Sequence, residues 1–454
     1  MSGSTDSPAV EQSQAVAPAP EKEAGLKGWY TVVMLAGVIM LGQIDRNIIS
    51  LMVQPIKRDL GLSDTEMGIL TGLAFSITYV MFGPPIARVA DRGFRKPVIA
   101  SCLAIWSVAT TLCGLAQNYW HLFLGRAIVG GAESGSSPAS LSMIADVIPR
   151  DKLPRAYAIY NTGFMLGGAL ALTIGGLLLG HFPQYEPFHL EGIGVIRDWQ
   201  IVFMIIGLPG VLVAALIMVT VPEPQRKAGH KPQGYPLREV LSFIWTNRRM
   251  HGPLLAGALL NSIQSFGAIA WIPAFYERTY GWGPEVAGPL LGPINMGAAL
   301  VGLFGGAFLT EWLGRRRDDA NVRMLFLANF LCIPFIVIQP LMPTAWLALT
   351  IGAIGGSIAA MGGAGYNSAL QVSTPNAMRG QINALYLFMI AAVGGTLGPL
   401  FIGLLTDFVA GNEGDLRYVL AAFRLALAPL DALLIWFAIR PYGKAFRERI
   451  NAGD

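Results

Sequence analysis

The stretch FLGRAIVGGAESGSSPASLSMIA, from Phe123 to Ala145, is apolar or small at almost every position. About 20 such residues are enough for a helix to cross the ~30 Å hydrocarbon core of a bilayer. Arg126 and Glu133 interrupt the run with two ionisable side chains. The stretch therefore predicts a transmembrane helix, and it raises the question of what two charges do inside one.

The composition of the whole chain also indicates a membrane protein. Of its 454 residues, 53% are hydrophobic and 13% are charged, whereas a soluble domain carries about 25% charged residues. The first 25 residues are rich in Ser, Ala, Pro and Glu without the apolar core of a signal peptide, so residues 1–28 are predicted to be a disordered cytoplasmic tail. Cys102, Cys113 and Cys332 lie in apolar runs without disulfide or metal spacing, so no metal and no cofactor is expected.

Twelve apolar runs are long enough to cross the membrane, which predicts an all-α polytopic protein. They lie at residues 29–53, 66–87, 97–116, 119–147, 154–180, 198–221, 252–279, 284–310, 322–341, 344–372, 380–408 and 416–440. A polar stretch with four prolines divides them into two sets of six. We therefore expect an N-terminal six-helix bundle at 29–221, a cytoplasmic linker at 222–251, a C-terminal six-helix bundle at 252–440 and a cytoplasmic tail at 441–454.

The distribution of basic residues orients these spans. With both ends of the chain inside the cell, the inner segments carry most of the 32 Lys and Arg residues. The outer segments carry only five, namely Lys57, Arg58, Arg197, Arg278 and Arg417. Because Lys and Arg are enriched in cytoplasmic loops, the sequence predicts a multi-pass protein of the inner or plasma membrane with both termini cytoplasmic.

The two halves of the chain repeat one another at their loops. The segments ARVADRGFRKP (87–97) and AFLTEWLGRRR (307–317) each place Ala four residues before an acid, Asp91 or Glu311, with two basic residues four and five positions after it. The segments PRDKLPRAYAIYN (149–161) and TPNAMRGQINALY (374–386) likewise align Arg155 with Arg379. Single basic loops can serve orientation alone, but the matched spacing favours a parallel duplication, which is typical of transporters with a site between their halves.

The loop at 87–97 resembles the signature loop of the major facilitator superfamily, although Gly93 follows the acid by two residues instead of three and Phe94 takes the usual glycine position. The resemblance implies twelve helices in two pseudo-symmetric six-helix bundles that alternate access to a central site. It also implies a cytoplasmic gate, for which we expect Asp91, Arg92, Arg95, Lys96, Arg155, Glu311, Arg315 and Arg379.

Ionisable residues inside the first and fourth spans are the strongest functional signal. Each charge costs about 2.5–3.5 kcal/mol at the middle of a lipid-facing helix, so Asp45, Arg46, Arg126 and Glu133 are expected to face one another or a wet cavity. At 1.5 Å per residue, Asp45 and Arg126 lie at similar depths, which predicts that they pair. Glu133 lies two turns further along the same face, where no second basic residue is apparent.

Two interpretations of these charges remain open. A static buried ion pair would fix helix packing. Alternatively, burial favours a neutral carboxylic acid while a neighbouring guanidinium favours the carboxylate, a competition that suits a proton-coupled site. Pro138 frees a backbone carbonyl and predicts a bend in the fourth span. In the last span, Arg424 and Asp431 share a helix face and are predicted to form a structural ion pair.

The segments GQIDRNIISLMVQPIKRDLGLSDTEMGILTG (42–72) and GRAIVGGAESGSSPASLSMIADV (125–147) resemble the spinster-like branch of the superfamily, whereas the second half supports only the superfamily. That resemblance implies proton-coupled transport of amphipathic lipids such as lysophospholipids or sphingoid phosphates, with Asp45, Arg46, Arg126 and Glu133 as the proton and substrate site. Similar proteins also include carriers of sugar acids and other organic anions, so that alternative stays open.

The second half offers uncharged polar residues for the remainder of a cavity. The candidates are Asn261, Gln264, Ser265, Tyr366, Asn367, Asn383 and Tyr386. A cavity that is ionic on one side and apolar or aromatic on the other would suit a small amphipathic or anionic substrate, with protons and the lipid bilayer as the other partners. We expect a monomer without a nucleic acid partner. No enzyme activity is expected, because the five histidines lie in loops or at span ends. A facilitator without proton coupling, and either symport or antiport, remain alternatives.

Overall fold

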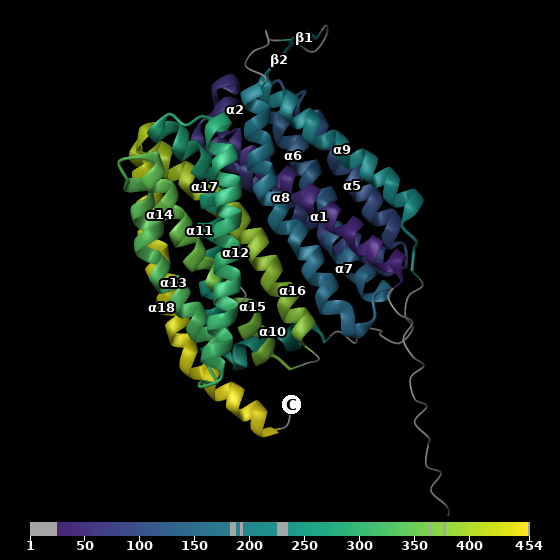
Figure 1. Cartoon of the computed structure of the whole chain (residues 1–454), viewed down its shortest axis with the longest axis vertical. Helices are drawn as coiled ribbons and strands as arrows, with labels where there is room; N and C mark the ends of the chain where they lie inside the picture. The colour runs from purple at the N-terminus through teal and green to yellow at the C-terminus, as the bar shows by residue number, and fades with distance from the viewer. Residues whose placement is uncertain are drawn as a thin grey trace, which may run out of the picture.

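The apolar runs of the chain fold as helices, and the computed structural model describes residues 25–181, 188–190, 194–224, 235–363, 365–375 and 378–452. Twelve membrane-crossing segments form two six-helix bundles, which lie side by side in Figure 1. In the described part of the chain, eleven helical segments are long and apolar enough to cross a bilayer. The fourth span is not among them, because it is divided into two helices of 15 and 12 residues.

The N-terminal half contains seven main helices and several short elements. They are α1 (Leu26–Leu51), α2 (Val53–Leu60), α3 (Asp64–Gly68), a π-helical turn (Ile69–Leu73), α4 (Ala74–Asp91), α5 (Arg95–Cys113), α6 (Tyr119–Glu133), α7 (Ser136–Val147), a 3-10 turn (Arg150–Lys152), α8 (Leu153–His181) and α9 (Asp198–Thr220). Between α8 and α9 lies a two-stranded antiparallel hairpin, β1 (Phe188–Leu190) and β2 (Gly194–Ile196), which the sequence analysis did not anticipate.

The C-terminal half has the same number of spans with more interruptions. Its elements are α10 (Leu237–Thr246), α11 (Arg248–Tyr280), α12 (Pro284–Gly314), α13 (Ala320–Ile338), a 3-10 turn (Gln339–Leu341), α14 (Ala345–Met361), α15 (Gly365–Ser373), α16 (Arg379–Met389), a π-helical turn (Ile390–Gly394), α17 (Gly395–Leu405), a second π-helical turn (Thr406–Ala410), a 3-10 turn (Glu413–Asp415) and α18 (Leu416–Ala452).

The ends of the expected bundles differ from the sequence boundaries. Helix α1 already begins at Leu26, inside the expected tail, while residues 1–24 lie outside the described residues. The expected linker holds helix α10 and the first turn of α11, and its residues 225–234 are not described. The expected C-terminal tail continues α18 to Ala452, because its Lys, Arg and Glu side chains favour a helix once it has left the lipid.

The division of the fourth span follows from Pro138. Proline has no N–H to bond the carbonyl four residues earlier, and its ring crowds that carbonyl. The helix is interrupted at residues 134–135, between α6 and α7, as the sequence predicts. Two serines compensate the polar backbone there, since the Ser134 hydroxyl donates to the Gly131 carbonyl at 2.7 Å and the Ser136 hydroxyl donates to the Glu133 carbonyl at 2.9 Å. The interruption places Glu133 at the last position of α6.

The two halves share a core at only one end of the molecule. One buried apolar cluster contains residues of both halves, including Ile48, Met67, Phe275 and Leu291. A second cluster draws only on residues 32–221 and a third only on residues 250–442. We name the end that carries α2, the start of α3 and the segment 406–417 the closed end, and the end that carries α10 and the last turns of α18 the open end.

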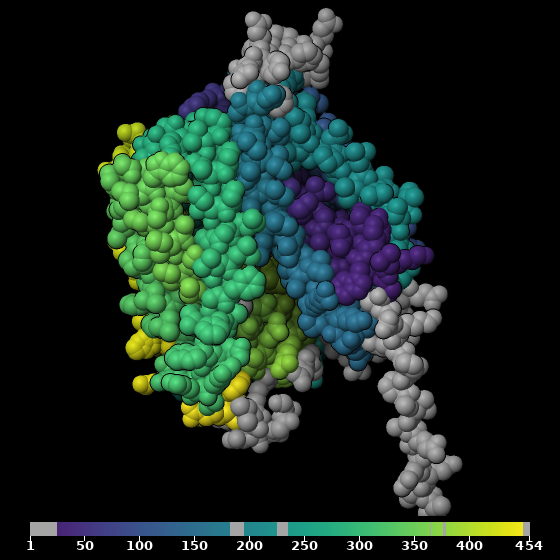
Figure 2. Space-filling view, viewed as in Figure 1, coloured from purple at the N-terminus to yellow at the C-terminus, as the bar shows by residue number. Residues whose placement is uncertain are grey.

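The surface agrees with this division. Figure 2 shows the halves in contact toward the closed end and a hollow between α8 and α12 toward the open end. Small residues allow the close approach at the closed end, because a Cβ on Gly176 of α8 would lie 3.0 Å from the Cα of Gly288 in α12. The structure therefore has a conformation in which the two halves separate at the open end and pack together at the closed end.

Candidate functional site

The charged residues of α1 and α6 meet inside the N-terminal half. The Arg46 guanidinium donates to the Glu133 carboxylate, with 2.6 Å between Nη2 and Oε1. Gly42 makes room for the carboxylate, since a Cβ at that position would lie 3.2 Å from Glu133 Oε1. The expectation that Glu133 has no basic neighbour is therefore wrong. Each residue of a helix is rotated by about 100° from the one before it, so Arg46 reaches Glu133 while Asp45 points elsewhere.

Asp45 and Arg126 are neighbours, as their similar depths predict. Arg126 Nη1 donates to the Asp45 backbone carbonyl at 3.2 Å and lies 3.9 Å from Asp45 Oδ1. The other carboxylate oxygen of Asp45 accepts a hydrogen bond from the Thr110 hydroxyl on α5. The contact to the backbone is the shorter of the two, so the charge pairing is looser than that between Arg46 and Glu133.

Several polar atoms of this cluster have no hydrogen-bond partner among the described residues. Arg126 is only 1% exposed, yet its Nε and Nη2 donors are unpaired, and so is one carboxylate oxygen of Asp45 and one of Glu133. Buried donors and acceptors without partners are costly, and they are rare unless a ligand or water completes them. The cluster therefore has the hydrogen-bonding capacity to bind a further polar group.

Two aromatic side chains of α4 complete the cluster, and the sequence analysis missed both. The Arg46 guanidinium carbon lies 4.6 Å from the Phe75 ring centre and 5.2 Å from that of Tyr79, while the Arg126 guanidinium carbon lies 5.5 Å from Phe75. Such stacking orients a guanidinium and partly replaces its lost hydration. The i, i+4 spacing of Phe75 and Tyr79 was the available signal, but aromatic residues are common in apolar spans.

Two polar candidates of the second half, Asn261 and Tyr366, belong to a different cluster. The Tyr366 hydroxyl donates to Asp431 Oδ1 at 2.6 Å, and Asn261 Nδ2 lies 3.4 Å from Asp431 Oδ2. Asn329 on α13 donates to the same tyrosine hydroxyl at 3.1 Å. Within the described residues, no hydrogen bond joins the candidates Asn261, Gln264, Ser265, Tyr366, Asn367, Asn383 and Tyr386 to the four charged residues of α1 and α6.

The predicted ion pair between Arg424 and Asp431 is wrong. Arg424 Nη1 donates instead to the Ile336 carbonyl at 2.7 Å and to Gln339 Oε1 at 2.9 Å, while Asp431 is bonded by uncharged donors from other helices. Seven residues place the two side chains on one face but about 10 Å apart along the helix axis. Each therefore takes a nearer partner.

The expected gate residues lie at the open end, and those with described partners contact their own half. Arg95 forms an ion pair with Asp146 and a longer one of 3.4 Å with Glu223. The Glu311–Arg315 pair lies within α12. Arg155 stacks on Trp29, and Arg379 donates to the Thr374 carbonyl. Asp91, Arg92 and Lys96 lie at the junction of α4 and α5. A cytoplasmic gate built from these residues stays a prediction.

Charged side chains join the two halves at the closed end instead. Arg278 of α11 binds Asp64 of α3 with both nitrogens, at 2.6 and 2.7 Å. Lys57 of α2 lies 2.5 Å from Asp64 and 2.7 Å from Glu413 of the C-terminal half. Asp64 and the Arg278 side chain are almost completely buried. The sequence analysis treated Lys57 and Arg278 only as outer-loop charges.

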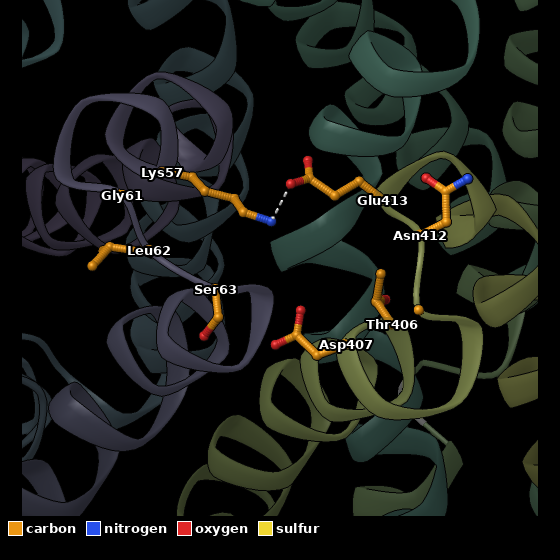
Figure 3. A pocket seen from close by; sticks show the side chains of 9 residues that line it. Lys57, Gly61, Leu62, Ser63, Thr406, Asp407, Asn412 and Glu413 are labelled. Carbon is orange, nitrogen blue, oxygen red and sulfur yellow. Dashed lines mark ion pairs between the residues drawn. The ribbon is translucent and has the colours of Figure 1, made fainter.

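A second carboxylate at this interface, Asp407, belongs to the C-terminal half and bonds to the N-terminal half. It accepts hydrogen bonds from the Thr65 backbone N–H and hydroxyl, both at 2.7 Å, and from the Asp64 N–H at 3.2 Å. An acid near a helix N-terminus satisfies free N–H groups and the helix dipole. Figure 3 shows Asp407 facing Ser63, and Lys57 paired with Glu413. These residues line a cavity of about 420 Å³. The closed end is thus held by reciprocal ionic contacts.

Comparison with known proteins extends these observations. The model of the Major Facilitator Superfamily matches residues 35–441. An MFS-type efflux pump of Mycolicibacterium smegmatis is 28% identical, covering 92% of this chain and 94% of its own. The sphingosine-1-phosphate transporter SPNS2 of Danio rerio is 24% identical, with 74% and 69% covered. A hexuronate transporter of Bacillus subtilis is 24% identical, with 90% and 93% covered.

A solved structure gives the same relationship. A bacterial homologue of the human lysosomal transporter Spinster, in an inward-facing and unoccupied conformation, is 26% identical and superposes with a TM-score of 0.75, covering 93% of this chain and 97% of that one. The similarity to the spinster-like branch that the residues around Asp45 and Glu133 predict is confirmed by these relatives.

Proposed function

Because this chain belongs to the major facilitator superfamily, a family of transporters, we propose that it is a proton-coupled secondary active transporter of an amphipathic anion. The superfamily is not an enzyme class, and the relatives named above are transporters. The proposed substrate is a lipid with an anionic head, such as a lysophospholipid or a sphingoid phosphate. The similarity to the sphingosine-1-phosphate transporter SPNS2 supports that class.

The observation that carries the proposal is the state of Arg126. This guanidinium is buried, fixed in place by the Asp45 backbone, and retains two unpaired donors among the described residues. A phosphate or carboxylate binds such a planar fork with two parallel charge-assisted hydrogen bonds. Arg126 is therefore the proposed anchor for the substrate head.

Charge balance supports coupling to protons. Asp45, Arg46, Arg126 and Glu133 together carry no net formal charge when all four are ionised. A bound anion leaves the buried cluster with an excess negative charge, which is unfavourable away from water. A proton on Glu133 removes that excess and releases Arg46 toward the substrate. The anion and the proton are therefore expected to bind together.

The two ends of the molecule fit alternating access. Reciprocal ion pairs hold the closed end, whereas the halves part at the open end, which carries most of the basic loops. The positive-inside rule supports a cytoplasmic open end, so both termini are proposed to be cytoplasmic, in an inner or plasma membrane. Opening of the closed end would then expose the cluster to the other side.

Transport into proteoliposomes under an imposed pH gradient tests this proposal. We expect gradient-driven accumulation by the parent protein, and its loss in the Glu133→Gln and Asp45→Asn variants although both still insert. Glu239→Gln on exposed α10 is the matched control, with the same chemical change away from the cluster. Proton coupling would be contradicted if the flux did not depend on the pH gradient, or if the two variants retained full accumulation. The protein would then be a facilitator.

A small organic anion such as a sugar acid is the second candidate substrate, because the hexuronate transporter aligns over most of both chains. The two classes differ in the need for an apolar tail. A thermal-shift screen of lysolipids against sugar acids at two pH values separates them. Stabilisation by short anions alone would select the sugar-acid class, and stabilisation that requires an acyl chain would select the lipid class.

A further inference from the structure

A second cavity lies at the open end of the C-terminal half, apart from the charged cluster of α1 and α6. Its volume is about 510 Å³. The end of α12, the connection to α13, the first turn of α13 and the last turns of α18 surround it. Its polar lining includes Arg316, Arg317, Asp318, Arg323 and Arg447. Nothing in the proposed transport cycle uses these residues.

The walls of this cavity are tied together by two ion pairs. Asp319 lies 2.7 Å from Arg323 of α13, and Asp318 lies 3.0 Å from Arg447 of α18. Among the described residues, no carboxylate pairs with Arg316 or with Arg317. The lining therefore carries two uncompensated positive charges, which is suited to an anion.

Arg316 is oriented by stacking on Trp312. Its guanidinium carbon lies 5.2 Å from the centre of the indole ring, and Trp312 is half exposed on the surface of α12. Tryptophan is enriched where a membrane helix passes from lipid to water. The geometry thus places the uncompensated arginines at the level of the lipid head groups.

An apolar stripe leads from the cavity along the lipid-facing side of α12. Val301, Phe304 and Phe308 are 65–70% exposed and precede Trp312 at helical spacing, so all four side chains lie on one face. Their span of eleven residues is about 16 Å at 1.5 Å per residue. One leaflet contributes about half of the ~30 Å hydrocarbon core, so the stripe is as long as one layer of acyl chains.

We propose that this cavity binds the head group of an anionic phospholipid, whose phosphate contacts Arg316 and Arg317 and whose acyl chain lies along the stripe of α12. Basic pockets between membrane helices on the cytoplasmic side are suited to such lipids. The adjoining apolar stripe favours a lipid over free phosphate, because free phosphate has no acyl chain to pack against it. At its other end, α12 packs through Gly288 against Gly176 of α8, so the lipid would bind a helix that contacts the other half.

Native mass spectrometry of the purified full chain tests this site with phosphatidylglycerol and phosphatidylcholine as probes. We expect the parent to retain phosphatidylglycerol in preference, and Arg316→Gln/Arg317→Gln to weaken that retention by roughly thirtyfold, since each of the two basic residues near a membrane surface contributes about 1 kcal/mol. Arg316→Lys/Arg317→Lys keeps the charge, so it should retain most of the binding and shows that the site tolerates substitution.

Matched controls separate this site from general surface charge and from the transport site. Arg248→Gln/Arg249→Gln removes two exposed arginines of the same half, one of them stacked on Trp245 at 5.5 Å, but outside the cavity. Both this control and Arg126→Gln should retain phosphatidylglycerol. The proposal would be overturned if the Arg316/Arg317 glutamine variant retained as much phosphatidylglycerol as the parent, or if either control lost as much as that variant. Displacement of the lipid by millimolar inorganic phosphate would also overturn it. So would a dimer without bound lipid, because a second copy of the chain would then cover the stripe.

Discussion

The pair of Arg46 with Glu133 and the pair of Arg278 with Asp64 each contain a buried carboxylate, but only the second joins the two halves of the molecule. The first lies between α1 and α6 and can persist while the halves rock against each other. The second, from α11 to α3, must break before the closed end can open. The comparison separates two proposed roles for similar chemistry: charges within a half would hold a proton and an anion, and charges across the halves would set which side is open.

The largest expected effect is on the pair that crosses the interface. Removing one partner of a buried ion pair costs about 3–5 kcal/mol, which is roughly a hundredfold or more in an equilibrium constant. Asp64→Asn should therefore shift the protein toward a conformation open at the closed end. The measurement is the labelling rate of Leu62→Cys, which lines the closed-end cavity, with a membrane-impermeant maleimide.

Asp59→Asn is the control for that variant. Asp59 lies at the same end, but its partners Arg197 and Trp199 belong to the same half, at 2.8 and 2.7 Å. Its loss should leave the labelling rate unaltered. Equal acceleration in both variants would show that any lost charge loosens this end, and no acceleration in Asp64→Asn would remove the pair from the gate.

The next effect concerns substrate binding within the N-terminal half. Arg126→Gln removes two charge-assisted hydrogen bonds to the proposed anion, each worth about 1.5–3 kcal/mol. Affinity for the anion should fall by about a hundredfold or more, while the labelling rate at Leu62→Cys in the absence of substrate stays close to that of the parent. Titration of both proteins with the best ligand of the screen gives the result. Undiminished affinity would assign Arg126 to packing alone.

A smaller effect is expected at the helix cap that crosses the interface. Asp407→Ala leaves the first N–H groups of α3 without their acceptor, and the loss of such a cap costs about 1 kcal/mol. Labelling at Leu62→Cys should rise several-fold, well below the effect of Asp64→Asn. Asn412→Ala is the control, because among the described contacts the Asn412 side chain accepts a hydrogen bond only from the Gly414 N–H of its own loop. An effect as large as that of Asp64→Asn would mean that the cap, and not the ion pair, dominates the gate.

The smallest effect is expected for an ion pair that is exposed. Glu311 and Arg315 are more than 70% exposed and lie one turn apart on α12. Pairs of this kind contribute about 0.3–0.5 kcal/mol. Glu311→Gln should leave the melting temperature within experimental error of the parent. A clear drop would indicate that this residue has a structural partner in another conformation.

The spans and the charged cluster were accessible from the sequence for one physical reason. Charge in an apolar run is expensive, so Asp45, Arg46, Arg126 and Glu133 stand out from their surroundings without any alignment. The rise per residue also predicted that Asp45 and Arg126 lie at the same depth. It did not predict the basic partner of Glu133, because depth alone ignores the rotation between consecutive residues that turns Arg46 toward Glu133.

Other features could not be predicted because they need the packed halves. Phe75 is one of 22 phenylalanines, and only its position under two guanidiniums distinguishes it. Asp64 and Arg278 lie beside loops, where charges are ordinary, and they form an ion pair only when α3 meets α11. The error for Arg424 and Asp431 has the same origin, since spacing along one helix cannot reveal better partners on α13 and α15.

The central claim is that the cluster of α1 and α6 binds an anion and a proton together. Proton uptake by the purified protein in weakly buffered detergent solution, measured on addition of the transported anion near neutral pH, tests it most directly. We expect the parent to take up close to one proton per bound anion and Glu133→Gln to take up almost none while still binding. Anion binding without proton uptake in the parent, or equal uptake in both proteins, would contradict the claim.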